Sequence, residues 1–493
     1  ITLPFVGTQR GGSSNTFFGY IFGATSYSGN QAAVPETLKS VVITDDTTIA
    51  QNAFYNCDTI TKVVVPESVT SIGLGAFKGC VAIEDITLPF VGNSLTAQYH
   101  DAVFGYIFGY VSKQVREDSE SSDGDDHYDF RPETSNAFIN AHYIPIPTDT
   151  TWQYSGKANY RLKSYHYYIP TTIKNVTITV QTDIPLAAFN GCDFLQTIDL
   201  PDETKSIGAY AFQNCSVLKR LNSETDGLYN IPVGVTEIGG YTFRNCVLLE
   251  DLVLGNNVTS IGSYAFSGCS LLSKFNSDTA KELIIPNGVE IIDRYAFQNV
   301  LLVTKVVVPE SVTSIGLGAF KGCVAIEDIT LPFVGNSLTA QYHDAVFGYI
   351  FGYVSKQVRE DSESSDGDDH YDFRPETSNA FINAHYIPIP TDTTWQYSGK
   401  ANYRLKSYHY YIPTTIKNVT ITVQTDIPIA AFNNCSLVES IILPYTVETH
   451  GSIGEYAFQN CNASISYSYI PQVSVPWDGV KISDKYHSGN GTM

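Results

Sequence analysis

A short aromatic element recurs along most of this 493-residue chain and constrains its fold more than any other feature. The element is an Ala-Phe pair, with Thr242-Phe243 as a variant. Most neighbouring pairs lie 23 or 31 residues apart, a spacing typical of units that stack as coils of a solenoid. A single coil cannot bury its own apolar face, so the coils must pack on one another. The ten anchor residues are Phe54, Phe77, Phe189, Phe212, Phe243, Phe266, Phe297, Phe320, Phe432 and Phe458.

Each unit also contains a strand signal and a corner signal. Short β-branched runs, such as those at 63–65 and 284–285, precede the anchors and suit one rung of a parallel sheet. A Val-Thr-x-Ile-Gly element follows, as at 69–73, and its glycine permits a tight corner. The 31-residue units contain eight extra residues, for which we expect longer turns at one edge.

The nine cysteines share one position of the repeat, three residues after an anchor phenylalanine. Val300 occupies the tenth equivalent position. A position that accepts valine needs a small buried apolar side chain, rather than a metal ligand, a nucleophile or a disulfide partner. We therefore expect the cysteines to be core residues, although thiols of stacked coils could lie close enough to pair in places.

The full unit, Val-Thr-Ser-Ile-Gly-x-x-Ala-Phe-x-x-Cys at 69–80 and 258–269, closely resembles the BspA-type leucine-rich repeats of bacterial and some protist surface proteins. The resemblance covers nearly all of the chain outside two insertions. The resemblance and the repeat period together predict a β-rich solenoid, which is a right-handed leucine-rich-repeat superhelix of about 23-residue coils. We expect one continuous parallel sheet and a mostly non-helical return side. The resemblance implies secretion or surface display, in some members adhesion, and no catalytic residues.

Two long insertions interrupt the repeat. Residues 61–185 and 304–428 are identical in sequence, and each copy contains an insertion, at 110–168 and 353–411. A shorter relative of the unit opens the chain, with only the ten residues 24–33 at the equivalent place. Long loops on rigid scaffolds usually contain binding sites. The expected organisation is a single solenoid over 1–493, with these two insertions and a C-terminal cap or truncated continuation over 462–493.

The first part of each insertion is acidic and could bind calcium, because hard cations take several carboxylate oxygens. The run at 123–126 lacks the spacing of an EF-hand, so a solvated or disordered acidic loop is the alternative. No cofactor other than structural calcium is expected. The candidate calcium ligands are Asp123, Asp125, Asp126, Asp129, Asp366, Asp368, Asp369 and Asp372.

The second part of each insertion is aromatic and includes Tyr143, Tyr165, Tyr167 and Tyr168 in the first copy. Such rings could form a platform for sugars or for a protein, or they could pack the insertion onto the solenoid. Both roles can hold for different residues. The candidate ligand-binding residues are Trp152, Tyr154, Tyr160, Trp395, Tyr397 and Tyr403.

Charge and missing motifs exclude several classes of function. With 29 Lys+Arg against 50 Asp+Glu, the net charge of −21 disfavours nucleic acid and anionic membrane surfaces. The chain has no apolar run long enough for a transmembrane segment. It begins at Ile1 without a signal peptide, and Met493 is its only methionine, so we expect both ends to be incomplete. No Walker loop, His-Glu-x-x-His or Gly-x-Ser-x-Gly element is present, and we expect no enzyme activity.

These observations predict a non-enzymatic binding protein that is secreted or displayed on the cell surface. It would recognise an extracellular protein or glycan, in the manner of an adhesin, through the duplicated insertions and the solenoid faces. The alternative is a structural or self-assembling surface or fibre component, because uncapped solenoid ends expose strand edges that favour self-association.

Overall fold

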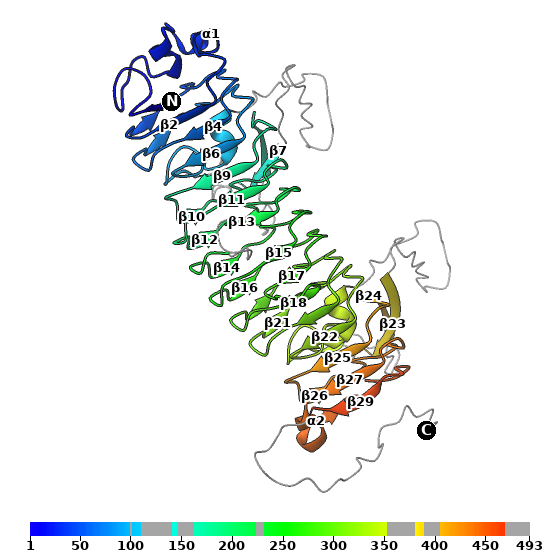
Figure 1. The fold of residues 1–493 in the computed structure, drawn as a ribbon. Helices are drawn as coiled ribbons and strands as arrows, with labels where there is room; N and C mark the ends of the chain where they lie inside the picture. Colours follow the sequence, from blue (N-terminus) through cyan, green and yellow to red (C-terminus); the bar gives the residue numbers. More distant parts are fainter. Residues whose placement is uncertain are drawn as a thin grey trace, which may run out of the picture. The chain divides into compact units, whose positions relative to one another are not determined.

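The computed structural model describes residues 1–98, 101–109, 141–145, 162–222, 231–352, 380–388 and 405–468. The chain divides into two compact units, Ile1–Leu249 and Glu250–Met493. Each unit is a stack of coils whose short strands pair in parallel (Figure 1). The predicted fold class, a β-rich leucine-rich-repeat solenoid with about 23 residues per coil, is confirmed, since equivalent strands such as β2 (Ser40–Ile43) and β4 (Lys62–Val64) lie one repeat apart.

The first unit is built on a seven-stranded parallel sheet, in which one or two residues of each strand point inward. Val63, Ile86 and Val176 are such inward residues and are at most 2% exposed, whereas the residues beside them face outward. In sheet order the strands are β1 (Thr2–Leu3), β2, β4, β6 (Asp85–Leu88), β9 (Asn175–Ile178), β11 (Thr197–Asp199) and β13 (Arg220–Leu221).

The second unit has an eight-stranded sheet of the same kind. Its last strand lies in the region for which the sequence suggested a cap or a continuation, and it pairs in register with the strand before it, Ser440↔Ser464 to Leu443↔Tyr467. In sheet order the strands are β15 (Asp251–Leu252), β17 (Lys274–Phe275), β18 (Glu282–Ile284), β20 (Lys305–Val307), β22 (Asp328–Leu331), β25 (Asn418–Ile421), β27 (Ser440–Leu443) and β29 (Ser464–Tyr467).

The return side contains a feature that the sequence did not indicate: two-residue strands, most of which end in a buried isoleucine. In the first unit these are β3 (Thr48–Ile49), β5 (Ser71–Ile72), β10 (Asp183–Ile184), β12 (Ser206–Ile207) and β14 (Glu237–Ile238). In the second they are β16 (Ser260–Ile261), β19 (Ile291–Ile292), β21 (Ser314–Ile315), β26 (Asp426–Ile427) and β28 (Ser452–Ile453).

The glycine that follows six of these strands allows close approach between coils. A Cβ atom built on Gly73 would lie 2.2 Å from the backbone nitrogen of Gln51, and one on Gly316 would lie 2.2 Å from that of Arg294. The return side is otherwise mostly non-helical. Its short helices are η1 (Phe18–Phe22), η2 (Tyr27–Gly29), α1 (Asn30–Ala33), η4 (Phe104–Phe108), η5 (Tyr342–Ala345), η6 (Phe347–Phe351) and α2 (Tyr445–His450).

The anchor phenylalanines form stacked columns inside the coils. The ring centroids of Phe54 and Phe77 are 5.0 Å apart, and those of Phe266 and Phe297 are 5.4 Å apart. All nine cysteines are free and buried, and Val300 is fully buried at the tenth position. The expectation that the cysteines are core residues is therefore confirmed.

The eight extra residues of the longer unit form the expected turn at 276–281 in the second unit, and they also add a strand. The strand β18 begins eight residues after β17 and pairs with it in parallel, Lys274↔Glu282. The addition therefore inserts an extra strand into the main sheet. It also brings Phe275 into the core, where its ring lies edge-on to those of Phe266 and Phe297.

Each insertion lies within a single very long coil that has an anchor of its own. The strands β6 and β9 are neighbours although Asp85 pairs with Asn175, 90 residues later. Phe104 fills this coil and packs on Phe189, with the centroids 5.3 Å apart, and Phe347 packs on Phe432 in the same way at 5.4 Å. The count of ten anchors therefore missed these two residues, because Val-Phe-Gly replaces the Ala-Phe pair there.

Candidate binding site

The residues proposed from sequence as ligands for calcium or for a binding partner all lie outside the residues that the structure describes. These are Asp123, Asp125, Asp126, Asp129, Asp366, Asp368, Asp369 and Asp372 for calcium, and Trp152, Tyr154, Tyr160, Trp395, Tyr397 and Tyr403 for a ligand. The structure does describe the base of each insertion, where the chain leaves the solenoid and returns to it.

At the base, the two ends of the insertion meet directly. The first insertion leaves after Gly109, whose φ of 83° suits glycine, and the backbone N–H of Tyr168 donates to the Gly109 carbonyl oxygen at 2.9 Å. In the second unit Tyr411 donates to Gly352 at the same distance. Each insertion is therefore closed at its root by a backbone hydrogen bond.

A buried tyrosine fixes this root in the core. Tyr167 is 1% exposed and Tyr410 is fully buried. Each ring lies against a glycine of a short helix: a Cβ atom on Gly105 would come 2.4 Å from Cγ of Tyr167, and one on Gly348 would come 2.5 Å from Cβ of Tyr410. No residue other than glycine could occupy either position unless the tyrosine moved.

The next tyrosine closes the root from outside. The ammonium group of Lys78 lies 5.1 Å from the ring centroid of Tyr168, and that of Lys321 lies 4.8 Å from Tyr411, within the range of a cation–π interaction. For Tyr167, Tyr168 and their second copies, the structure therefore supports packing onto the solenoid, which was one of the two roles considered from sequence.

Beyond the root, both insertions contain the same two-stranded antiparallel ladder. In the first, β7 (Ala141–Pro145) pairs with β8 (Leu162–His166), and in the second, β23 (Ala380–Pro388) pairs with β24 (Leu405–Pro413). The register is equivalent, with Ala141 opposite His166 and Ala384 opposite His409. The strand β24 runs through the buried tyrosine and contacts η6, so this ladder is continuous with the root.

The start of the chain shows how a coil closes without an insertion. There Asn30, fully buried, takes the place of the tyrosine and accepts a hydrogen bond from the Gly19 backbone N–H at 2.9 Å. Its side-chain amide donates to the carbonyl oxygen of Ala53 at 3.0 Å. The short loop 24–33 is therefore a natural insertion-free version of the same root.

The outer face of the main sheet is a second candidate surface, best developed in the second unit. Its first column pairs opposite charges between adjacent strands: Lys305 to Glu282 at 3.0 Å and Lys274 to Asp251 at 3.8 Å. Hydrogen bonds from Ser277 and then Lys305 hold the pKa of the Glu282 carboxyl below its usual value. The next column is made of the partly exposed residues Ile284, Val307, Thr330, Thr420 and Ile442.

Facing charges on this surface are paired from one coil to the next. A self-neutralised face with a β-branched column beside it can contact a protein surface. Among the described residues, a shallow apolar pocket in the first unit has a cavity volume of about 10 Å³. That is below the roughly 300–1,000 Å³ of ligand pockets.

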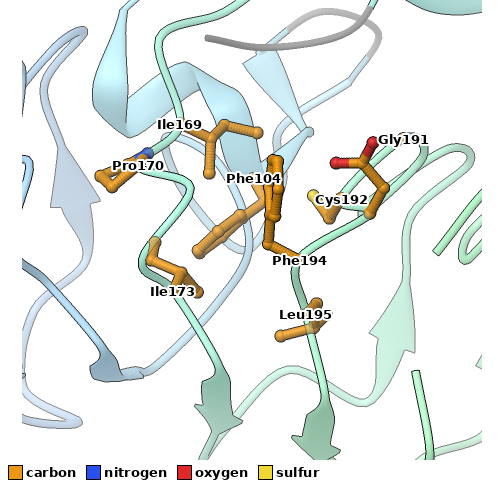
Figure 2. A pocket seen from close by; sticks show the side chains of 9 residues that line it. Phe104, Ile169, Pro170, Ile173, Gly191, Cys192, Phe194 and Leu195 are labelled. Carbon is orange, nitrogen blue, oxygen red and sulfur yellow. The ribbon is translucent and has the colours of Figure 1, made fainter. Parts of the chain in front are cut away.

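Figure 2 shows that the pocket lies between the segment that follows the first insertion and a corner of the next coil. Ile169, Pro170 and Ile173 come from the first of these, and Phe194 and Leu195 come from the second. The thiol of Cys192 also lines the pocket, but burial raises its pKa well above the ordinary value. A protonated thiol is a poor nucleophile and a poor metal ligand.

The other thiols are similar in character. Burial raises the pKa of both Cys57 and Cys323 to about 12. Within the described ranges, no three His, Cys, Asp or Glu side chains lie close enough together to hold a metal ion. In the same part of the chain, no helix is both long and apolar enough to cross a membrane.

Several solved structures are similar to this chain. A leucine-rich repeat protein from Bacteroides ovatus is 16% identical, with a TM-score of 0.35 over 87% of this chain and 92% of that one. A leucine-rich cell surface protein from Faecalibacterium prausnitzii is 18% identical, with a TM-score of 0.24 over 87% and 84%. The pneumococcal vaccine antigen PcpA is 11% identical, with a TM-score of 0.29 over 87% and 79%. No curated protein matches the sequence.

The sequence model of the BspA type leucine rich repeat region matches in six copies, over residues 35–102, 160–276, 273–342 and 404–475. These ranges cover more than half of the chain and flank both insertions. The stacked anchors, the buried cysteine position and the 23-residue coil are the features that the matched segments share. This chain therefore belongs to the BspA-type leucine-rich repeat family.

Proposed function

We propose that this chain is a non-enzymatic binding protein, secreted or displayed on a cell surface, which recognises an extracellular protein or glycan in the manner of an adhesin. The observation that carries the proposal is the repeated root: two identical insertions leave their solenoids through the same hydrogen bond, buried tyrosine and lysine contact. Long loops held by a rigid scaffold are where recognition is usually located.

The composition of the insertions supports two kinds of contact. Residues 110–140 contain eight acidic and three basic side chains, a net charge of −5, so the two copies account for −10 of the chain's −21. A partner with a basic surface would be attracted, and calcium held by Asp123, Asp125, Asp126 and Asp129 could order this part. Trp152, Tyr154 and Tyr160 would supply the aromatic contacts that dominate many binding interfaces.

The outer sheet face would add contact area beside the insertions. Its neutralised charges and its β-branched column suit a broad protein contact rather than capture of a small ligand. Such a contact would be of the ordinary kind, with a partly apolar centre and a polar margin.

The test replaces each insertion by the chain's own short loop. Residues 110–168 and 353–411 are each exchanged for residues 24–33, in which Asn30 closes the root in place of the tyrosine. The wild-type chain and this chimera are then applied to arrays of extracellular-matrix proteins and glycans. We expect the wild-type signals to disappear in the chimera while circular dichroism shows that the solenoid is retained.

Two further chimeras, each with one insertion exchanged, complete the design. Since the insertions are identical, each single exchange should keep the same ligand and weaken the signal. Wild-type binding by the double chimera would move the site to the solenoid faces, and no binding by the wild-type chain would reject the adhesin-like function.

A further inference from the structure

The turn that follows the cysteine position is covered in the coil next to the insertion-free root. There Nε2 of Gln31, in the short loop 24–33, donates to Oδ2 of Asp58 at 2.8 Å. The ring of Tyr27, in the same loop, lies edge-on to that of Tyr55, with the centroids 5.5 Å apart. The short loop therefore places an aromatic ring and a hydrogen-bond donor against the next coil.

The equivalent turn beside the first insertion forms one wall of the shallow pocket in Figure 2. Asp193 takes the position of Asp58, one residue after the cysteine, and lines this pocket. Phe194 also lines it and is 41% exposed. Ile169 and Pro170, which follow the insertion, line the other wall. The turn therefore keeps the carboxylate of the covered version but presents an exposed ring beside it.

Exposed apolar side chains continue along this edge of the first unit. Val81, in the coil before the insertion, and Val247 both follow a cysteine directly and are exposed. The segment after the insertion reaches the same edge, since Oγ1 of Thr172 donates to the carbonyl oxygens of Val81 at 2.9 Å and of Ile83 at 2.7 Å. Exposed apolar side chains that gather in one place often mark a protein contact. We call Val81, Phe194 and Val247 the apolar edge.

We infer that the pocket and the apolar edge of the first unit dock a protein partner, which places one apolar side chain in the pocket and a hydrogen-bond donor against Asp193. The short loop shows this kind of occupant, because it packs Tyr27 and Gln31 on the equivalent turn. The pocket volume of about 10 Å³ suits the tip of one side chain rather than a whole sugar ring.

The charge of the region favours a donor that is basic. Asp193 lies beside an insertion whose residues 110–140 contain eight acidic and three basic side chains, a net charge of −5. A lysine or arginine of the partner would be attracted by both. The expected partner segment therefore has an aromatic or aliphatic side chain next to a basic one.

The inference rests on the proposed function and narrows it, because it makes the partner of the first insertion a protein and not a glycan. It also makes the two insertions unequal. In the second unit the equivalent turn has Ser436 in place of Asp193 and Leu437 in place of Phe194, so the carboxylate is missing there. A partner with a basic donor should therefore bind more tightly beside the first insertion.

The test uses the two chimeras in which one insertion is exchanged, so that each retains a single insertion. Surface plasmon resonance measures their dissociation constants for the extracellular-matrix proteins and the glycans of the array. Three substitutions are made in the chimera that keeps the first insertion: Phe194→Ser, Phe194→Leu and Asp193→Ser. Val233→Ser is the matched control, because Val233 is an exposed apolar residue of the same unit at a different corner, after Pro232.

We expect Phe194→Ser to raise the dissociation constant for a matrix protein at least about tenfold, as loss of a dominant interface residue does. Phe194→Leu keeps an apolar side chain and should retain most of the affinity. Asp193→Ser should weaken binding and make it less dependent on salt. The chimera that keeps the second insertion should bind more weakly than the one that keeps the first, and Val233→Ser should bind as its parent does.

Hydrogen exchange separates docking from a structural role of the ring. Exchange of the Tyr168 amide, whose hydrogen bond closes the root, should be the same in Phe194→Ser and in its parent. Faster exchange would assign the ring to holding the root and overturn the inference, as would an unchanged dissociation constant in Phe194→Ser or an equal rise in Val233→Ser. Binding to glycans alone overturns it but leaves the proposed function standing, whereas a wild-type chain that binds neither class rejects both.

Discussion

A single methyl group at Gly105 and at Gly348 tests whether the buried tyrosines hold the insertions on the solenoid. In the double variant Gly105→Ala with Gly348→Ala, each new Cβ would overlap Tyr167 or Tyr410 at 2.4–2.5 Å. Carbon atoms that are not bonded to each other do not approach so closely. Either the backbone around the short helix shifts, or the tyrosine leaves its place in the core.

The two outcomes differ in their cost in free energy, and we base the expected effect on the smaller cost. Overpacking that neighbours can absorb costs about 1–3 kcal/mol. Loss of a whole buried aromatic side chain costs about 3–5 kcal/mol. We therefore expect the root of each insertion to be destabilised by about 1–3 kcal/mol, which raises the equilibrium constant for local opening roughly 5- to 150-fold.

Hydrogen exchange at the Tyr168 and Tyr411 amides measures this opening. Both amides are bonded to glycine carbonyl oxygens at 2.9 Å, so they exchange only when the root opens. A global unfolding midpoint is less suitable, because long repeat arrays need not unfold in one step. Both copies are substituted together because residues 61–185 and 304–428 are identical. Peptides from the two copies have the same mass and sequence, so their exchange is measured as one signal.

Gly29→Ala is the control, because a Cβ there would lie 3.4 Å from Cβ of Ala24, an ordinary contact. It should leave exchange at Tyr168 and Tyr411 unchanged. Wild-type exchange at these amides in the Gly105→Ala, Gly348→Ala variant would refute the reasoning that the buried tyrosines hold the insertions.

Four further predictions follow from the core, the sheet face and the insertions. The nine buried thiols should resist a thiol reagent in the native chain and react together on unfolding; rapid native reaction would contradict the packing. Because burial raises the pKa of Cys323 from 9.0 to about 12, this thiol stabilises the fold fully below pH 9, and that contribution is lost as the pH rises towards 12. The Cys323→Val variant should therefore lose less stability than the wild type between pH 8 and about 11 in urea titrations, and an equal loss would contradict the shift. Ser277→Ala should raise the pKa of Glu282, since the serine hydrogen bond is the main cause of its lowering; an unchanged carboxyl titration by NMR would refute this. Calcium should raise the melting temperature of the chain by binding the acidic segments. A melting temperature that neither calcium nor a chelator changes would remove calcium from the proposal.

The coil architecture could be predicted because every coil repeats the same physical constraints. An inward aliphatic residue, an anchor phenylalanine and a small residue three positions later recur ten times, so a chance pattern is excluded. Val300 alone identified the cysteine position as core, and its full burial confirms this. Local pattern and global stacking point to the same fold here.

The rest of the fold depends on contacts between distant residues. Nothing near Phe104 shows that it stacks on Phe189, 85 residues later, because its neighbours lack the usual alanine and cysteine. The strand β17 was hidden: the sequence predicted the rung at 284–285, which overlaps β18, but a parallel neighbour eight residues earlier does not follow the 23-residue period.

For the candidate site, the sequence located both insertions but not the way they are held. The pairing of Gly105 with Tyr167 is not visible from either residue alone, because 61 positions lie between them. A usable signal was present at the start of the chain, where Phe18-Gly19-Tyr20-Ile21-Phe22 repeats the motif without the insertion.

The most direct test of the account is the affinity of one array ligand for the wild-type chain and for the double chimera that has residues 24–33 in place of both insertions. Surface plasmon resonance should give a dissociation constant at least about a hundredfold higher for the folded chimera, as expected when the main contacts of an interface are removed. Equal dissociation constants would contradict the claim that the insertions carry recognition.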